Sequence, residues 1–179
     1  MRILITGPTG SGKTTQATLL ASHLSLCFLG VGRILRQVAK KDTKVARAIS
    51  KAFEKGVLAD DRVVAGVVRD RLKAKGCKGF VIDGFPRSLG QLKFLDPKYD
   101  LVFFLKVSDE VAIKRLLGRG RKDDKLQLVE KRLKIYHQIT EPAVDYYRQQ
   151  GVVHEVDGSK DLAEVQRGIR EIADEHSAS

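Results

Sequence analysis

The chain has 179 residues, of which 42% are hydrophobic and 31% are charged. This composition is that of a globular domain with a sizeable core, and it excludes collagen-like, low-complexity and disordered chains as well as a helix spanning a membrane. The formal net charge of +11 indicates an anionic partner, which is either a polyanion such as nucleic acid or a small phosphorylated ligand.

Strand and helix patterns alternate along the chain, which predicts an α/β fold with a parallel sheet between two layers of helices. Short apolar runs typical of strands buried on both faces occur at 2–6, 26–29, 79–82, 101–107 and 152–156. Helical patterns cover 12–24, 32–40, 43–54, 60–75, 109–119, 124–149 and 160–174. Pro142 is expected to kink the longest helix, and residues from 176 onward are expected to fray.

The segment from Gly7 to Thr14 reads G-P-T-G-S-G-K-T and lies between the first predicted strand and the first predicted helix. This is the phosphate-binding loop (P-loop) pattern in the strand–loop–helix context that it requires. Its glycines permit turns that aim backbone N–H groups inward, and the helix N-terminus adds positive potential. Lys13 is expected to reach the β- and γ-phosphates of a nucleoside triphosphate, and Thr14 to ligate Mg²⁺.

A second informative segment, from Phe80 to Arg87, reads F-V-I-D-G-F-P-R. In this architecture a carboxylate at the end of a buried strand lies beside the phosphate loop, where it can hold Mg²⁺ or its waters. The alternative is a plain strand-ending turn, which Asp-Gly also favours. Considered together with the loop, the segment indicates that Asp83 is a second metal ligand.

A third feature is a set of arginines near the junction of two predicted helices: Arg115, Arg119, Arg121 and Arg132. The alternative interpretation is a solvated basic face, which is the usual role of such a run. Few carboxylates on the same helix face match these arginines. Phosphoryl transfer needs guanidinium groups to stabilise charge on the equatorial oxygens, so we favour a catalytic cluster.

The distribution of basic and aromatic residues, the two cysteines and the N-terminal segment indicate which partners and which cellular compartment to expect. The basic residues are scattered, 6% of residues are aromatic and there is no Trp for stacking on bases, so we expect small phosphorylated ligands and no nucleic acid. Cys27 and Cys77 lie in unrelated apolar surroundings and predict neither a disulfide framework nor a metal site. With no signal peptide before the first strand, we expect a cytoplasmic protein.

These motifs resemble, in order and over nearly the whole chain, those of the adenylate kinases and their nucleoside monophosphate (NMP) kinase relatives. Gly32 to Arg36 is similar to the family's G-D-L-L-R, and further similarity lies at 115–119, 121–124, 132–136 and 156–159. The resemblance implies a single P-loop kinase domain, 1–179, with a three-layer α/β/α fold and a five-stranded parallel sheet. It implies a core of 1–29, 60–119 and 125–179, an NMP-binding insert of about 30–59 and a short lid of about 120–124.

The resemblance also implies direct in-line phosphoryl transfer from Mg·ATP to a nucleoside monophosphate, most simply AMP, by a monomer. The residues it implies for ATP binding are Gly10, Ser11, Gly12, Lys13, Thr14, Thr15, Arg119 and Lys160. Those implied for the acceptor are Val31, Arg36, Val57, Leu58, Ala59, Gly84, Phe85, Pro86, Arg87, Gln91, Arg121 and Arg132. The implied catalytic groups are Lys13, Arg87, Arg115, Arg119, Arg121 and Arg132, with Thr14 and Asp83 at Mg²⁺.

Departures from the family pattern keep two alternatives open. Val31 stands where the family has a Thr that hydrogen-bonds near the base. Relatives that prefer pyrimidine acceptors often have a small residue there, so the acceptor could be UMP, CMP or another monophosphate. Arg33 replaces an acidic residue and either binds phosphate or points to solvent. The alternative from another class is a nucleotide-dependent nucleic-acid-binding protein without kinase activity. Only Gly120 separates Arg119 from Arg121, which leaves no room for a zinc-bearing lid.

Overall fold

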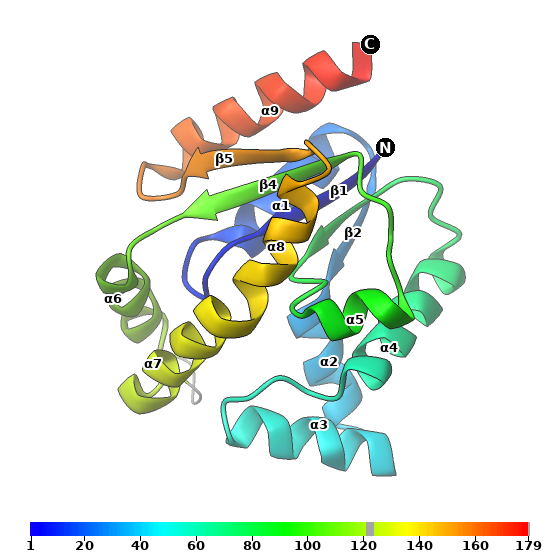
Figure 1. The fold of residues 1–179 in the computed structure, drawn as a ribbon, viewed down its shortest axis with the longest axis vertical. Coiled ribbons are helices and arrows are strands. Elements are labelled where there is room, and N and C mark those ends of the chain that lie inside the picture. The colour runs from blue at the N-terminus through cyan, green and yellow to red at the C-terminus, as the bar shows by residue number, and fades with distance from the viewer. Residues whose placement is uncertain (121–123, 179) are drawn as a thin grey trace.

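Within residues 1–120 and 124–178, which the computed structural model describes, five parallel strands form one sheet in the order β2-β3-β1-β4-β5 (Figure 1). The strands are β1 (Arg2–Thr6), β2 (Cys27–Gly30), β3 (Phe80–Asp83), β4 (Leu101–Lys106) and β5 (Val153–Asp157). Each lies within one residue of its predicted bounds. The predicted α/β fold with a five-stranded parallel sheet is therefore confirmed.

Side chains of the central strand alternate between two cores, as the pleat of a strand requires. Ile3 and Ile5 pack beneath α1 (Lys13–His23) and α9 (Leu162–Ala178), whereas Leu4 faces the core covered by α4 (Asp61–Lys75) and α8 (Glu141–Arg148). Figure 1 shows these helices on the two sides of the sheet. Because both faces are covered, the strands are the continuous apolar runs that the sequence displays.

The register brings the ends of three neighbouring strands to one edge of the sheet. Asp83 at the end of β3 pairs with Ile5 of β1 and with Gly30 of β2. After β1 the chain moves outward to β2, and after β3 it crosses β1 to reach β4. Ligands of open α/β sheets bind where the strand order reverses in this way, at the carboxyl ends of the strands.

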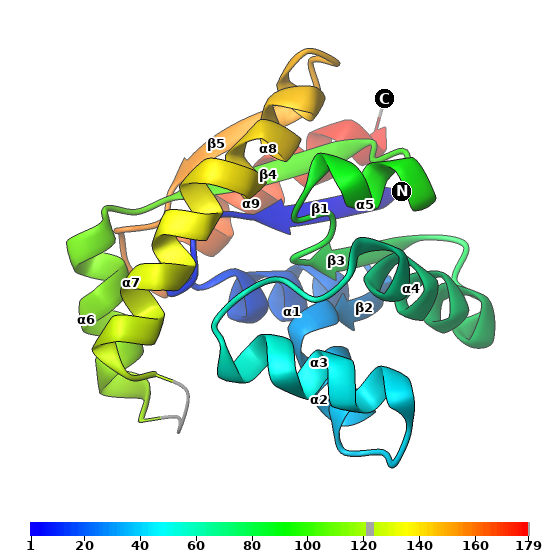
Figure 2. The ribbon, with the colours of Figure 1, turned by 60° about the horizontal axis from the view of Figure 1, so that its bottom comes forward.

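The excursion between β2 and β3 is helical, as predicted, and consists of α2 (Val31–Ala39), α3 (Lys44–Glu54) and α4. Figure 2 shows α2 and α3 set apart from the strands. Leu35 and Ile49 from these two helices join the core under α4. Thr43 and Asp60 cap α3 and α4 by accepting backbone N–H groups, which fixes where each helix begins.

The predicted helix 124–149 is a rod of three pieces, namely α7 (Leu126–Ile135), the π-helix η1 (Tyr136–Thr140) and α8. Pro142 is the second residue of α8 and lacks the N–H group that a regular helix would use. The Glu141 N–H group bonds to the Tyr136 carbonyl, five residues back. The irregularity expected at the proline is therefore a π-turn that directly precedes it.

Two helices near the site complete the fold. Helix α6 (Asp109–Arg119) packs on α7 through a small apolar cluster. Helix α5 (Leu89–Phe94) has no counterpart among the predicted helices. The last helix extends to Ala178, so the expected fraying from 176 onward is wrong for 176–178. No helix of the described residues is both long and apolar enough to cross a membrane.

Cys27 and Cys77 form a disulfide, with 6.0 Å between their Cα atoms, so the prediction of two unrelated cysteines is wrong. The prediction failed because the helical excursion separates the cysteines by 50 residues yet returns to a neighbouring strand. Cys27 begins β2 and pairs in register with Phe80, just after Cys77. The bridge joins the two ends of the helical excursion. Because both cysteines are paired, they are not evidence of a reducing compartment.

Candidate functional site

The predicted phosphate loop follows β1 and folds against the ends of two other elements. Gly7 has φ of +142°, and a Cβ atom there would lie 2.5 Å from the Leu105 carbonyl oxygen of β4. Gly10 has φ of +87°, and its Cβ atom would lie 2.7 Å from the Ala112 carbonyl oxygen of α6. Glycine is therefore required at both positions, for backbone conformation and for space.

Lys13, the first residue of α1, reaches back across this loop. Its Nζ donates to the Pro8 carbonyl oxygen at 2.6 Å. Burial lowers the pKa of Lys13 to about 8; the neighbouring Asp83 opposes this shift, and Arg87 and Arg119 add to it. The charged neighbours of Lys13 are therefore predicted site residues: Asp83 at the end of β3, Arg87 in the turn that follows it, and Arg119 of α6.

Thr14, the second residue of α1, and Asp83, the last residue of β3, are the two predicted metal ligands, and their side chains meet. The Thr14 hydroxyl donates to Oδ2 of Asp83. The other carboxylate oxygen, Oδ1, is buried and has no hydrogen-bond partner among the described residues. Buried polar atoms in proteins are nearly always satisfied, so this oxygen fits a cation or its bound water.

The donor set at this place suits Mg²⁺. Magnesium prefers oxygen ligands and takes few of them from protein, because waters and phosphates complete its octahedron. Thr14 and Asp83 supply a hydroxyl and a carboxylate. Among the described residues, no group of three or more His, Cys, Asp or Glu side chains could hold a metal ion.

The turn after β3 holds Arg87 by its backbone and its side chain. The Arg87 N–H group donates to Oε1 of Gln91 at 2.8 Å, and the Arg87 Nε donates to the Gly84 carbonyl oxygen at 3.1 Å. The peptide bond between Phe85 and Pro86 is cis. Gln91, which the resemblance implies as a base-reading residue, therefore also supports the turn that carries Arg87.

Arg87 lies in a strongly positive environment. Burial lowers its pKa; Asp83 opposes this shift, and the charges of Arg36 and Arg132 add to it. Like charges brought close together destabilise one another unless an anion lies between them. The structure thus brings together three predicted site residues from different elements: Arg36 of α2, Arg87 of the turn after β3 and Arg132 of α7.

Arg119 and Arg132 share a carboxylate that the sequence analysis missed. Arg119 donates to Asp124 from Nε at 2.8 Å and from Nη2 at 2.7 Å, and Nη1 of Arg132 lies 3.7 Å from Asp124. Few carboxylates lie on the helix face of these arginines, whereas Asp124 lies beyond the end of α6. Its place in the motif at 121–124 was the available signal. Arg121 lies outside the described residues.

Arg115 and Lys160 bind partners in and after the loop that follows β5. Arg115 donates to the carbonyl oxygens of Gly158 at 2.7 Å and Ser159 at 3.2 Å, which ties α6 to the loop after β5. Lys160 is exposed and pairs with Glu164 at 2.6 Å, one turn along α9. An exposed pair of this kind contributes little to stability.

Of the residues predicted for the acceptor side, Val31 and Arg36 lie on α2, and Val57, Leu58 and Ala59 lie on the segment that follows α3. Val31 is buried, Val57 is exposed, and Leu58 and Ala59 are half-buried. Arg36 lies over the ring of Phe53 at 5.7 Å and donates to the Gly32 carbonyl oxygen at 3.2 Å.

Arg33, which departs from the family pattern, lies over the ring of Phe28 at 5.3 Å. The residue is exposed, in line with the interpretation that it points to solvent, and the like charges that act on Arg87 are those of Arg36 and Arg132.

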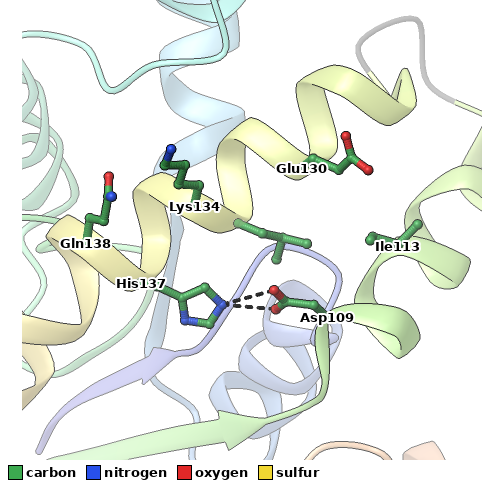
Figure 3. A pocket seen from close by; sticks show the side chains of 7 residues that line it. Asp109, Ile113, Glu130, Lys134, His137 and Gln138 are labelled. Atoms are coloured by element: carbon green, nitrogen blue, oxygen red, sulfur yellow. Dashed lines mark hydrogen bonds and ion pairs between the residues drawn. The ribbon is translucent and has the colours of Figure 1, made fainter.

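Two cavities lie beside the candidate site. The larger, of about 390 Å³, lies between α6 and α7, where His137 bonds to both carboxylate oxygens of Asp109 at 3.0 and 3.2 Å (Figure 3). The second, of about 320 Å³, touches the phosphate loop only at Pro8. None of the described residues predicted for the site lines either cavity.

Two further residues that the sequence analysis missed support the Arg87 turn. The buried Tyr99 donates its hydroxyl to the Phe85 carbonyl oxygen at 2.6 Å. Thr140 of η1 donates to the Arg87 carbonyl oxygen at 3.0 Å. No local pattern marks either residue, because each acts on a turn far away in the sequence.

Comparison with known proteins gives consistent matches over nearly the whole chain. The model of the adenylate kinase family matches residues 5–152. An adenylate kinase of Prochlorococcus marinus is 37% identical over 176 residues, which cover 94% of this chain and 96% of that protein. An adenylate kinase of Archaeoglobus fulgidus is 33% identical over 211 residues, covering 96% and 97%. Adenylate kinase 1 of a Nostoc species is 35% identical over 177 residues, covering 94% and 96%.

Proposed function

This chain belongs to the adenylate kinase family, and we propose that it transfers the γ-phosphoryl group of Mg·ATP to AMP, giving two ADP. The observation that carries the proposal is a group of cationic side chains around one buried carboxylate, beside a phosphate loop. The group consists of Lys13, Arg36, Arg87, Arg119, Arg132 and Asp83. Two phosphate chains held end to end need this density of positive charge.

On the donor side, the backbone N–H groups of the phosphate loop and the N-terminus of α1 would hold the ATP phosphates. The residues proposed for this are Gly10, Ser11, Gly12, Lys13, Thr14 and Thr15. Arg119 would contact the transferring phosphate. Arg115 and Lys160 would act through the loop after β5, which Arg115 holds at Gly158.

Magnesium would be held by the Thr14 hydroxyl and, directly or through water, by Asp83. The orphaned Oδ1 atom of Asp83 supports this placement. When bound, the ion neutralises charge on the β- and γ-phosphates.

On the acceptor side, Arg36 and Arg87 would bind the AMP phosphate. The insert of about 30–59, with Val31, Val57, Leu58 and Ala59, and the Gly84–Phe85–Pro86–Arg87 turn with Gln91 would enclose the nucleoside. Closure of this insert and of the lid near 120–124, which carries Arg121, would exclude water from the reacting groups.

The transfer needs alignment and charge stabilisation more than proton movement. An anionic oxygen of the AMP phosphate forms a bond to the γ-phosphorus of ATP, while the bond from that phosphorus to the β–γ bridging oxygen breaks. The attacking oxygen already carries negative charge, so no general base is required. Lys13, Arg119 and Arg132 would stabilise the charge on the equatorial oxygens.

The proposal includes a monomer, because every group named comes from one chain, and a cytoplasmic location, where both nucleotides are present. Val31 favours one alternative acceptor class, since its buried side chain offers no hydrogen bond to a base. UMP and CMP are therefore tested alongside AMP.

The test is ADP formation from ATP with a panel of AMP, GMP, CMP and UMP, with and without Mg²⁺. We expect Mg²⁺-dependent turnover that is fastest with AMP. Lys13→Ala should abolish turnover while the circular dichroism spectrum stays unchanged. Faster turnover with CMP or UMP would reassign the acceptor. No turnover with any monophosphate, together with salt-sensitive RNA or DNA binding, would overturn the proposal in favour of a nucleic-acid-binding protein.

A further inference from the structure

Thr140 joins two parts of the site that are 53 residues apart in the sequence. Its hydroxyl donates to the Arg87 carbonyl oxygen at 3.0 Å, and the residue is 5% exposed. Thr140 ends the π-helix η1, and Arg132 lies two turns earlier on the same rod, in α7. We propose that Thr140 is a positioning residue that fixes Arg87 relative to Arg132 for acceptor binding and transfer.

The local structure of η1 explains why this threonine sits where it does. The i→i−5 bond from Glu141 to Tyr136 adds one residue to the turn. Such a turn changes which face the following side chains occupy, and π-turns of this kind occur frequently at functional sites. Tyr136 and Val144, on either side of Thr140, pack together with Phe104 of β4, which holds the rod in place.

Arg87 needs such support because neighbouring positive charges repel its guanidinium group. The charges of Arg36 and Arg132 act on its guanidinium group from other elements. Like-charge repulsion would displace Arg87 unless its backbone were held. Gln91 of α5 accepts from the Arg87 N–H group, and Thr140 donates to the Arg87 carbonyl, so the residue is fixed on both sides.

Catalysis by charged groups depends on holding them in place before the substrate binds. Losing the Thr140 bond leaves the Arg87 carbonyl oxygen unsatisfied and frees the turn on one side. The acceptor half of the site would then lose alignment, whereas Thr140 bonds to the Arg87 turn and the Lys13 ammonium group bonds within the phosphate loop. The effect should therefore appear in the kinetics for AMP and not in ATP binding.

The inference rests on the proposed function, and its test has one arm that does not. Thr140→Val keeps the shape and removes the donor, and Thr140→Ser keeps the donor. Tyr136→Phe is the matched control, because the Tyr136 hydroxyl lies in the same π-helix, is buried and has no hydrogen-bond partner among the described residues. The readouts are KM and kcat for both nucleotides, and hydrogen exchange of the peptide covering 84–95 in the unliganded protein.

For T140V we expect kcat/KM for AMP to fall about 10-fold, the loss associated with one buried hydrogen bond, with the KM for ATP within about twofold of wild type. T140S should restore the AMP kinetics, and Y136F should match wild type. Exchange at 84–95 should accelerate in T140V alone. If T140V fails to fold, T140A and T140S provide the same comparison.

Unchanged AMP kinetics together with unchanged exchange in T140V would overturn the inference, as would equal losses for ATP and AMP that T140S does not restore. A wild-type protein that makes no ADP from AMP would instead refute the proposed function. The exchange arm would then still decide whether Thr140 holds the turn: faster exchange in T140V supports this, and unchanged exchange overturns it.

Discussion

Arg119 and Asp124 form a two-point ion pair across the end of α6, with Nε and Nη2 of the arginine 2.8 and 2.7 Å from the two carboxylate oxygens. The Asp124 side chain is 1% exposed, and Nη1 of Arg132 lies 3.7 Å from it. A guanidinium group held by both oxygens has a fixed plane as well as a fixed position. One buried carboxylate therefore orients two arginines that belong to different helices.

Asp124→Asn should lower kcat with little change in fold. The amide keeps the size of the carboxylate but turns one acceptor into a donor that faces the guanidinium groups. A hydrogen bond to a charged group contributes about 1.5–3 kcal/mol, so we expect a loss of about 10- to 100-fold in steady-state assays. Asp109→Asn at the start of α6 is the matched control and should stay within about twofold of wild type. A D124N enzyme with most of its kcat would contradict this role.

ATP affinity should weaken as the pH rises past about 8. Burial lowers the pKa of Lys13 to about 8, so the free protein loses this charge at a pH where an ordinary lysine keeps it. ATP binds the protonated form, and its phosphates raise the pKa of Lys13 again, so binding above pH 8 takes up a proton. The apparent Kd should approach a tenfold rise per pH unit above the pKa.

Calorimetric titration with ATP in two buffers of different ionisation enthalpy, at pH 7 and at pH 9, measures this proton uptake directly. Lys13→Met should bind ATP more weakly and show no uptake in this range. Equal proton uptake by wild type and K13M would show that another group titrates.

Asp83→Asn should raise the Mg²⁺ concentration that turnover requires and also lower stability. The variant weakens the proposed hold on Mg²⁺ or its waters, and losing a group that supports a metal in this way typically costs about 10- to 100-fold. Asp83 is also the carboxylate that offsets the buried charges of Lys13 and Arg87, so removing its charge should lower Tm. Turnover measured against Mg²⁺ concentration should shift to higher Mg²⁺. A D83N enzyme with the wild-type Mg²⁺ dependence would remove Asp83 from the metal site.

His137 should stabilise the protein more at low pH than at high pH. Partial burial lowers its pKa, but hydrogen bonds with Asp109 and Glu141 outweigh this and raise it (Figure 3). A histidine with a raised folded pKa contributes its stability below about pH 6.5, and the contribution is lost as the pH rises through the folded pKa.

Because the His137 side chain is 44% exposed, solvent screens the pair, and we expect His137→Gln to lower Tm by only about 1 to 3 °C near pH 6. The difference should vanish near pH 9. Lys134→Gln, which lines the same cavity, should show no such pH dependence. A deficit that stayed constant from pH 6 to pH 9 would mean that His137 acts by packing alone.

The sequence predicted the parts of the molecule that depend on neighbouring residues. The buried strands and the phosphate loop carry their own periodicity and glycine spacing, so they were predicted almost to the residue. Helix α5 was missed because its six residues are too few to show a helical repeat. The helix also has a poor helix former, Gly90, as its second residue. Its cap, the Ser88 hydroxyl accepting from the Gln91 N–H group, is the only local signal found for it.

The site was predicted less completely, because its supporting groups act across long sequence distances. Asp124 is five residues from Arg119 and was missed because it lies beyond the end of α6, whereas Tyr99 and Thr140 are recognised only when the fold brings them to the Arg87 turn. The disulfide failed for the same reason, since the pairing of Cys27 with Cys77 depends on β2 and β3 being neighbours.

That disulfide should be a major source of stability. It closes a loop of 50 residues that contains α2, α3 and α4, and the chain-entropy model assigns about 4 kcal/mol to a loop of this length. The double variant C27S/C77S should therefore unfold about 8 to 16 °C below the wild type. Neither cysteine is among the predicted site residues, so kcat at 25 °C should stay within about twofold.

Reductant provides the control. Dithiothreitol should lower the Tm of the wild type toward that of C27S/C77S and leave the double variant unchanged. Alkylation followed by mass spectrometry should find both thiols blocked in the native, oxidised protein and free after reduction. If both cysteines react without reductant, and the two proteins unfold at the same temperature, then the bridge does not form in solution and the base of the helical excursion is held by the pairing of β2 with β3 alone.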